Sequence, residues 1–110
     1  NDARRMELML ALATCGKHVR AVEIAEAVRA GSKDPELLCE VARCYAQCSA
    51  GLRATDANQA DAYADAAIAA LSEAIADGYG DRVAFDTDPD LDPIRDLPGY
   101  RALSGRLPGP

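Results

Sequence analysis

The sequence predicts an all-α domain of antiparallel helical hairpins, closed at its C-terminal end by a cap of short helices. Three observations support this fold class. Alanine, the best helix former, supplies much of the 49% hydrophobic content, whereas aromatic residues make up only 5%. Apolar residues recur at helical spacing, and glycines or capping residues separate the periodic segments. No run alternates apolar and polar residues as a half-buried strand would.

Four long helices are predicted, each separated from the next by a short connection. Their approximate spans are residues 2–14, 17–30, 34–50 and 57–76. A glycine, which tolerates the left-handed turn at a helix C-terminus, follows each of them: Gly16, Gly31, Gly51 and Gly78. The third helix has the clearest start, because Asp34 can cap the free amides and Pro35 fits the first turn. Gly51 is expected to break that helix.

The last third of the chain is rich in aspartate and proline. We expect short helical turns near residues 82–85 and 90–95 and a last short helix over 98–104. Apolar side chains of this part should fold back onto the preceding helices: Leu91, Ile94, Tyr100 and Leu103. Residues 1–107 are thus predicted to form a single domain, comprising a hairpin over 2–30, a hairpin over 34–77 and a capping segment over 78–107, followed by a frayed tail over 108–110.

The spacing of small and large residues in the hairpins resembles that of tetratricopeptide repeats (TPRs). The second hairpin carries this pattern at Leu38, Val41, Ala42 and Tyr45 and then at Ala67, Leu71 and Ala74, and the first hairpin fits more loosely. Small residues such as Ala42 and Ala67 let two helices approach closely, and large residues such as Tyr45 and Leu71 fill the space between hairpins. The resemblance implies a TPR-like α-α superhelix, in which each hairpin must stack on the next.

A second resemblance covers roughly residues 35–105. It rests on the segments 64–71, 74–79, Asp88-Pro89-Asp90-Leu91-Asp92-Pro93-Ile94 and Tyr100-Arg101-Ala102-Leu103. These are similar to the closing segment of C-terminal TPR regions in bacterial, planctomycete-type serine/threonine protein kinases. The resemblance implies a kinase domain in the parent protein. The kinase motifs themselves are absent from this sequence, so we expect the segment to be a non-catalytic, protein-protein interaction scaffold and not an enzyme.

In a TPR stack, the first helix of each pair lines a concave groove. The repeat alignment predicts a groove lined by Met6, Leu10, Glu36, Cys39, Arg43 and Gln47. The expected occupant is a protein or peptide partner, and preceding TPR repeats of the same chain are expected as neighbours. The Lys/Asn clamp with which some TPR proteins hold a peptide carboxylate is missing at these positions. A purely structural cap of a repeat array is the alternative reading.

A metal-responsive module that uses the cysteine cluster is a further alternative. The four cysteines are Cys15, Cys39, Cys44 and Cys48, and their spacing is not that of a zinc knuckle. We interpret them as small buried hydrophobes in a reducing compartment. A Cys15–Cys39 bridge in an extracytoplasmic protein and a metal site that combines His18 with cysteine remain the competing interpretations.

The aspartate-rich loop could serve such a module through calcium, because Asp86, Asp88, Asp90 and Asp92 alternate as in a calcium-binding loop. However, Leu91 and Leu97 stand where an EF-hand needs glycine and glutamate. We therefore expect Asp88 and Asp90 to cap short helical turns whose first residues are Pro93 and Pro98. No metal or cofactor is expected.

The net charge of -6 disfavours two kinds of partner. Nucleic-acid phosphates and anionic membrane surfaces would both repel such a chain. No stretch approaches the ~20 apolar residues that a membrane-spanning helix needs. The sequence opens inside an apparent helix without a methionine, so we expect a segment of a longer, cytoplasmic protein. A membrane anchor of the parent would lie elsewhere.

Overall fold

The computed structural model describes residues 7–8 and 17–107. Its elements are the α-helices His18–Gly31 (α2), Pro35–Leu52 (α3), Ala57–Ala76 (α4), Arg82–Thr87 (α5) and Pro98–Ser104 (α6), with a 3₁₀ helix, Pro89–Ile94 (η1). No strand occurs in the described ranges, so the all-α prediction is confirmed there. Most of the predicted first helix, with the groove candidates Met6 and Leu10, lies outside them, as does the tail over 108–110.

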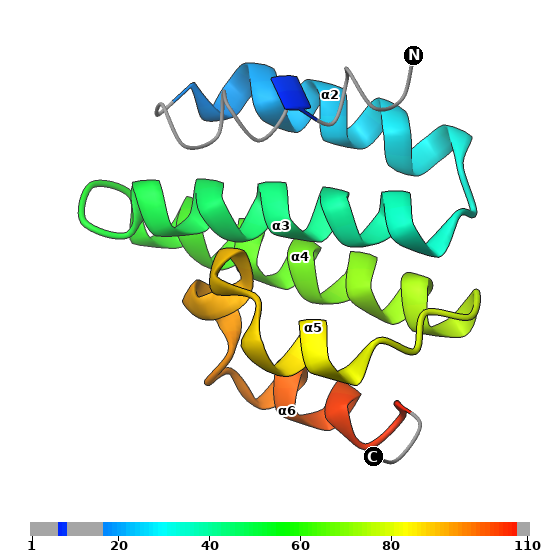
Figure 1. Ribbon diagram of the computed structural model, residues 1–110. Helices are drawn as coiled ribbons and strands as arrows, with labels where there is room; N and C mark the ends of the chain where they lie inside the picture. Colours follow the sequence, from blue (N-terminus) through cyan, green and yellow to red (C-terminus); the bar gives the residue numbers. More distant parts are fainter. Residues whose placement is uncertain (1–6, 9–16, 108–110) are drawn as a thin grey trace.

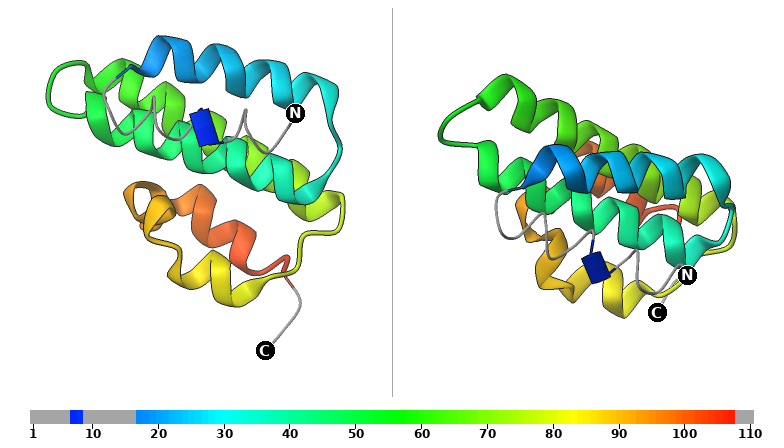
Figure 2. Two further views of the ribbon diagram at one scale, coloured as in Figure 1. Left: turned by 45° about the horizontal axis from the view of Figure 1, so that its top comes forward. Right: turned by 90° about the horizontal axis from the view of Figure 1, so that it is seen from above.

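Helices α2, α3 and α4 follow one another in antiparallel order, and α3 contacts both of the others (Figure 1). The capping segment, residues 78–107, lies on the opposite side of α3 from α2, and Figure 2 shows the same arrangement from two further directions. Within the described part of the chain, no helix combines the length and the apolar character needed to cross a bilayer.

Local capping explains where the long helices begin. The Asp34 carboxylate accepts a hydrogen bond from the amide of Glu36 at 2.9 Å, and Pro35 is the first residue of α3. Asp56 does the same for α4, accepting from the amide of Gln59 at 3.1 Å. Both starts match the prediction, because a side-chain oxygen satisfies amides that have no partner inside the helix.

The two glycines at the ends of α3 and α4 behave differently. Gly78 follows α4 with φ +114°, a backbone conformation that side chains disfavour, and α4 ends as predicted. The expected break at Gly51 is wrong: α3 continues through it to Leu52. Gly51 has no positive φ, and a single glycine weakens a helix by only about 1 kcal/mol relative to alanine, so the neighbouring turns can retain it.

Alanines form the contacts between the long helices. Ala21 on α2, Ala42 on α3 and Ala67 on α4 are each fully buried. The two helices of the 34–77 hairpin, α3 and α4, share the most extensive contact in the structure. Tyr45 and Leu71 are also buried and supply the larger side chains of this interface. These three alanines are thus buried among packed helices and do not point to solvent.

The capping segment folds back onto α3 and α4 as expected. Its buried residues include Phe85, Leu91, Ile94, Tyr100, Leu103 and Leu107. The predicted capping roles are only partly correct. Asp88 caps η1 and Pro98 begins α6. However, Asp90 and Pro93 lie inside η1 and do not start a turn of their own. The helix already begins at Pro89, because Asp88 and Pro89 supply the cap and the first residue earlier in the sequence.

Candidate functional site

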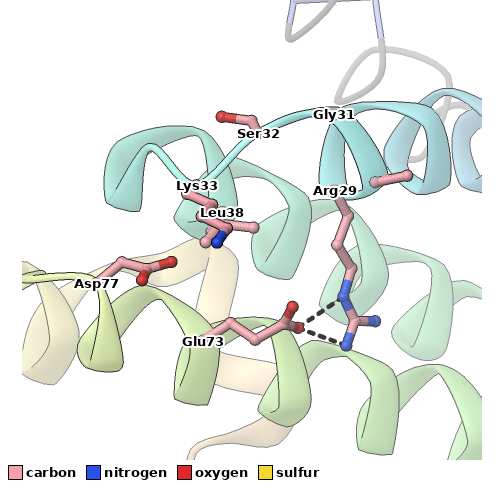
Figure 3. A pocket seen from close by; sticks show the side chains of 8 residues that line it. Arg29, Gly31, Ser32, Lys33, Leu38, Glu73 and Asp77 are labelled. Atoms are coloured by element: carbon pink, nitrogen blue, oxygen red, sulfur yellow. Dashed lines mark hydrogen bonds and ion pairs between the residues drawn. The ribbon is translucent and has the colours of Figure 1, made fainter.

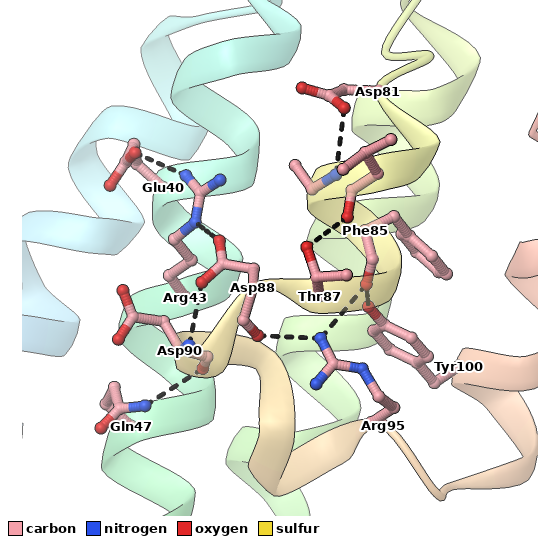
Figure 4. Close-up of polar contacts among 12 residues, drawn as sticks. Glu40, Arg43, Gln47, Asp81, Phe85, Thr87, Asp88, Asp90, Arg95 and Tyr100 are labelled. Atoms are coloured by element: carbon pink, nitrogen blue, oxygen red, sulfur yellow. Dashed lines mark hydrogen bonds and ion pairs between the residues drawn. The ribbon is translucent and has the colours of Figure 1, made fainter.

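Arg43 on α3 joins the long helices to the capping segment (Figure 4). Its Nε donates to the carboxylate of Asp88, and its Nη1 lies 2.5 Å from Oε1 of Glu40. The side chains of Arg43 and Asp88 are each only 14% exposed. Burial opposes the charge on Arg43, but the hydrogen bond to Asp88 and the attraction of Glu40 outweigh it and raise the arginine pKa. The guanidinium therefore stays charged inside a half-buried ion pair.

A second contact lies one turn further along α3. Gln47 donates from Nε2 to the backbone carbonyl oxygen of Asp90 at 3.1 Å. The amide of Asp90 in turn donates to the Asp88 carboxylate at 2.9 Å. Asp88 thus has two tasks, because one carboxylate oxygen caps η1 and the other accepts from Arg43. We call Arg43, Gln47, Asp88 and Asp90 the polar latch.

Arg95 holds the loop of the latch from inside the capping segment. Its Nη2 donates to the carbonyl oxygens of Asp88 at 2.8 Å and of Phe85 at 3.2 Å (Figure 4). Tyr100 donates its hydroxyl hydrogen to the same Phe85 carbonyl, and the two aromatic rings stack with centroids 4.2 Å apart. Burial raises the pKa of Tyr100 to about 12, so this hydroxyl keeps its proton at neutral pH.

The latch changes the prediction of an open partner groove. Glu36 is exposed on the first turn of α3, as a groove residue would be. Cys39 is fully buried, and burial raises the pKa of its thiol to about 11. Arg43 and Gln47 hold the capping segment of the same chain. In this structure, Arg43 and Gln47 therefore contact the protein's own C-terminal part, and Cys39 is enclosed in the core.

An open hollow of about 440 Å³ lies near the C-terminal end of the same helix, against η1. Its lining residues are Ser49, Ala50, Arg53, Asp92 and Pro93. Ala50 follows Gln47 by three residues, so the hollow continues the α3 stripe that contains the groove candidates. Arg53 contacts Asp61 of α4 at 2.5 Å, but their side chains are 48% and 68% exposed. Such an exposed pair contributes little stability, so Arg53 can exchange this partner for another.

A more polar cavity of about 280 Å³ lies at the connection between α2 and α3 (Figure 3). Arg29 on α2 spans it to Glu73 on α4, with Nε and Nη2 at 2.7 Å and 2.5 Å from Oε2. The hydrogen bond to Glu73 raises the arginine pKa. Lys33 and Asp77 are exposed at its edge. The cavity thus has two cationic and two anionic side chains, and its central pair ties α2 to α4.

The cysteines fit the structural interpretation. Cys39, Cys44 and Cys48 are buried and carry free thiols, while Cys15 lies outside the described residues. Over residues 7–8 and 17–107, no three histidine, cysteine or acidic side chains gather as potential metal ligands. His18 lies instead beside Tyr63, with ring centroids 6.2 Å apart.

Two of the four aspartates that were considered as calcium ligands have arginine partners. Asp88 pairs with Arg43 and Asp92 pairs with Arg95. Sequence reasoning did not anticipate these pairs or the role of Arg53. Only one local signal was available, because Glu40 and Asp92 each stand three residues before the arginine that they contact.

No protein-family model matches this chain, and searches of curated proteins and of solved structures also find no match. Over residues 7–8 and 17–107, the fold and the site define an all-helical structure with a latched capping segment.

Proposed function

We propose that this chain is a non-catalytic protein-protein interaction module of TPR type that binds a protein or peptide partner along α3. The observation that carries the proposal is the stripe on α3 that begins at the exposed Glu36, passes under the polar latch and ends in the 440 Å³ hollow at Ala50 and Arg53. Consecutive antiparallel helices with fully buried alanines at their contacts support the TPR-type interpretation.

The chemistry of the hollow suggests what the partner presents. Ala50 and Pro93 offer apolar surface, while Arg53 offers a half-exposed guanidinium that contacts the exposed Asp61 carboxylate and donates to the Ser49 hydroxyl at 3.2 Å. The expected partner is a peptide segment with an apolar side chain beside a carboxylate. The apolar side chain would be buried against Ala50 and Pro93, and the carboxylate would pair with Arg53 in place of Asp61. Arginine suits this role because its planar fork matches a carboxylate.

A photo-crosslinking amino acid at position 50 tests this proposal in extracts of the source organism. The matched control carries it at position 65, because Asp65 is exposed on α4 away from the hollow. We expect a partner captured only from position 50, whose measured affinity for the purified chain falls at least about tenfold for Arg53→Glu. Capture of the same proteins from both positions, or unchanged affinity of Arg53→Glu, would contradict the proposal.

A purely structural role is the second candidate, and the polar latch favours it. Because Arg43 and Gln47 bind the chain's own capping segment, this part of the stripe has an intramolecular occupant. In that case the segment seals a repeat array and needs no external partner.

We also propose that the parent protein is a bacterial serine/threonine kinase. The sequence that precedes Asn1 would test this proposal, because a kinase domain or further repeats are expected there.

A further inference from the structure

The polar cavity at the connection between α2 and α3 has charged groups of both signs (Figure 3). Arg29 and Glu73 pair with each other across it, so these two charges largely compensate. Lys33 and Asp77 lie exposed at its edge, and the side chain of neither one makes an ion pair or a hydrogen bond with another described residue. The cavity therefore offers one cation and one anion that have no partner in the described chain.

The connection between α2 and α3 provides further hydrogen-bond donors. Helix α2 ends at Gly31, and Ser32 after it has extended backbone angles. In the part of the chain that the structure describes, no group accepts a hydrogen bond from the backbone amides of Ser32 and Lys33, and both residues line the cavity. Two free amides beside an ammonium group suit a carboxylate, because its two oxygens accept several hydrogen bonds at once.

The other groups at the cavity are mainly acceptors. Glu73 and Asp77 stand four positions apart at the end of α4, and Figure 3 shows both carboxylates on the side of the cavity opposite the connection. Helix α2 also ends here, and within the described ranges no amide caps its last carbonyl oxygens. A helix C-terminus of this kind favours a cation. Two carboxylates beside it suit an ammonium group, which has three N–H donors.

We propose that this cavity binds a small zwitterion of the α-amino acid class. The ligand carboxylate pairs with Lys33 and the amides of the connection, and the ligand ammonium group pairs with Asp77 and Glu73. A simple anion would lie against two carboxylates, and a simple cation would lie against Arg29 and Lys33. A ligand with both charges therefore complements the cavity best.

The size of the cavity limits the ligand further. Its volume of about 280 Å³ lies below the roughly 300–1,000 Å³ of sites for drug-sized ligands. Leu38 is the one large apolar side chain of the lining. An amino acid with no side chain or with a short apolar one, such as glycine, alanine or valine, is therefore expected. The proposal goes beyond the interaction role and does not depend on it.

Glycine, L-alanine and L-valine are the probes for this site, with L-valinamide and N-acetyl-L-valine as controls that each lack one of the two charges. In ¹H–¹⁵N NMR spectra of the purified chain, at least one amino acid at millimolar concentration should shift the amide signals of Ser32, Lys33 and Asp77 in a saturable way. Both controls should bind roughly tenfold more weakly than L-valine or worse, because each loses hydrogen bonds to charged groups. No saturable shift with any of the three amino acids, or equal binding of either control, would overturn the proposal.

Paired variants locate the site. Lys33→Gln and Asp77→Asn each remove one exposed charge, and the affinity for the amino acid should fall at least about threefold in each. Lys17→Gln and Asp65→Asn make the same changes of net charge at exposed positions outside the cavity and should bind as the wild type does. Circular dichroism should show that all four variants remain helical. Equal affinity in all four would mean that the amino acid binds elsewhere and would refute the site.

Discussion

The polar latch gives the most direct test of how the capping segment is held. Arg43→Ala leaves the Asp88 carboxylate, 14% exposed, without its cation. Exposed ion pairs contribute about 0.2–1 kcal/mol, whereas breaking a fully buried pair costs about 3–5 kcal/mol. A half-buried pair lies between these limits, so we expect the free energy of unfolding to fall by about 2 kcal/mol. Asp88→Ala should cost about 1 kcal/mol more, because it also removes the cap of η1.

Asp88→Asn separates these two contributions, since the amide oxygen can still cap η1 but carries no charge. Urea unfolding followed by circular dichroism gives the free energy for each variant and for the Arg43→Ala/Asp88→Ala double mutant. The cycle should show a coupling energy of about 1–2 kcal/mol. A coupling below about 0.5 kcal/mol would mean that the pair does not hold the capping segment. Because the pair is half-buried, high salt should weaken the coupling only slightly.

Three further predictions test other parts of the structure. Gly78→Ala should lower the free energy of unfolding by about 1–2 kcal/mol, because Gly78 has φ +114°. Gly51→Ala should raise the free energy of unfolding by up to about 1 kcal/mol, because Gly51 lies inside α3 and an added methyl group would meet open space. Urea melts that show a change of the same sign for both variants would contradict this account. In a Cys15→Ser background at pH 8, the three buried thiols that remain, Cys39, Cys44 and Cys48, should react with a disulfide reagent only after unfolding. Rapid reaction of any native thiol would show that it is accessible. Burial raises the pKa of Glu40, so the folded state holds the Glu40 carboxyl proton more tightly than the unfolded state does. The stability that this proton contributes is present below about pH 4 and is lost as pH rises through the folded pKa. Glu40→Gln should therefore gain stability relative to wild type between about pH 4 and 7, and a difference that shrinks over this range would disprove this prediction.

Local signals located several helix ends correctly. Helix α4 begins after Asp56 and ends before Gly78, and α6 begins at Pro98, as the sequence predicted. In each case the residue acts through its own backbone or through amides within three positions. Gly51 misled the prediction because glycine can adopt helical angles as well as left-handed ones, and only the surrounding turns decide which it takes.

The contacts of the capping segment could not be predicted in the same way. Arg43 and Asp88 stand 45 positions apart, and Gln47 and Asp90 stand 43 apart. The repeat alignment assigned Arg43 and Gln47 to a groove because it describes only how hairpins stack. The turns at Gly78 and Asp88 determine which later segment packs against that face of α3. The spacing of residues along a helix does not predict the direction in which the chain leaves these turns. The aspartates suggested capping, and Asp88 also proved to be an arginine partner.

The capping segment follows α3 and α4 in the sequence, which affects the order in which these parts can form during synthesis. Helices α3 and α4 are joined by a short connection, so they can pair at a small cost in loop-closure entropy. Residues 78–107 leave the ribosome only afterwards. Until they emerge, Arg43 has no Asp88 carboxylate and the apolar surface that Leu91 and Ile94 later cover is open to chaperones. The polar latch can therefore close only after α3, α4 and the capping segment have all emerged.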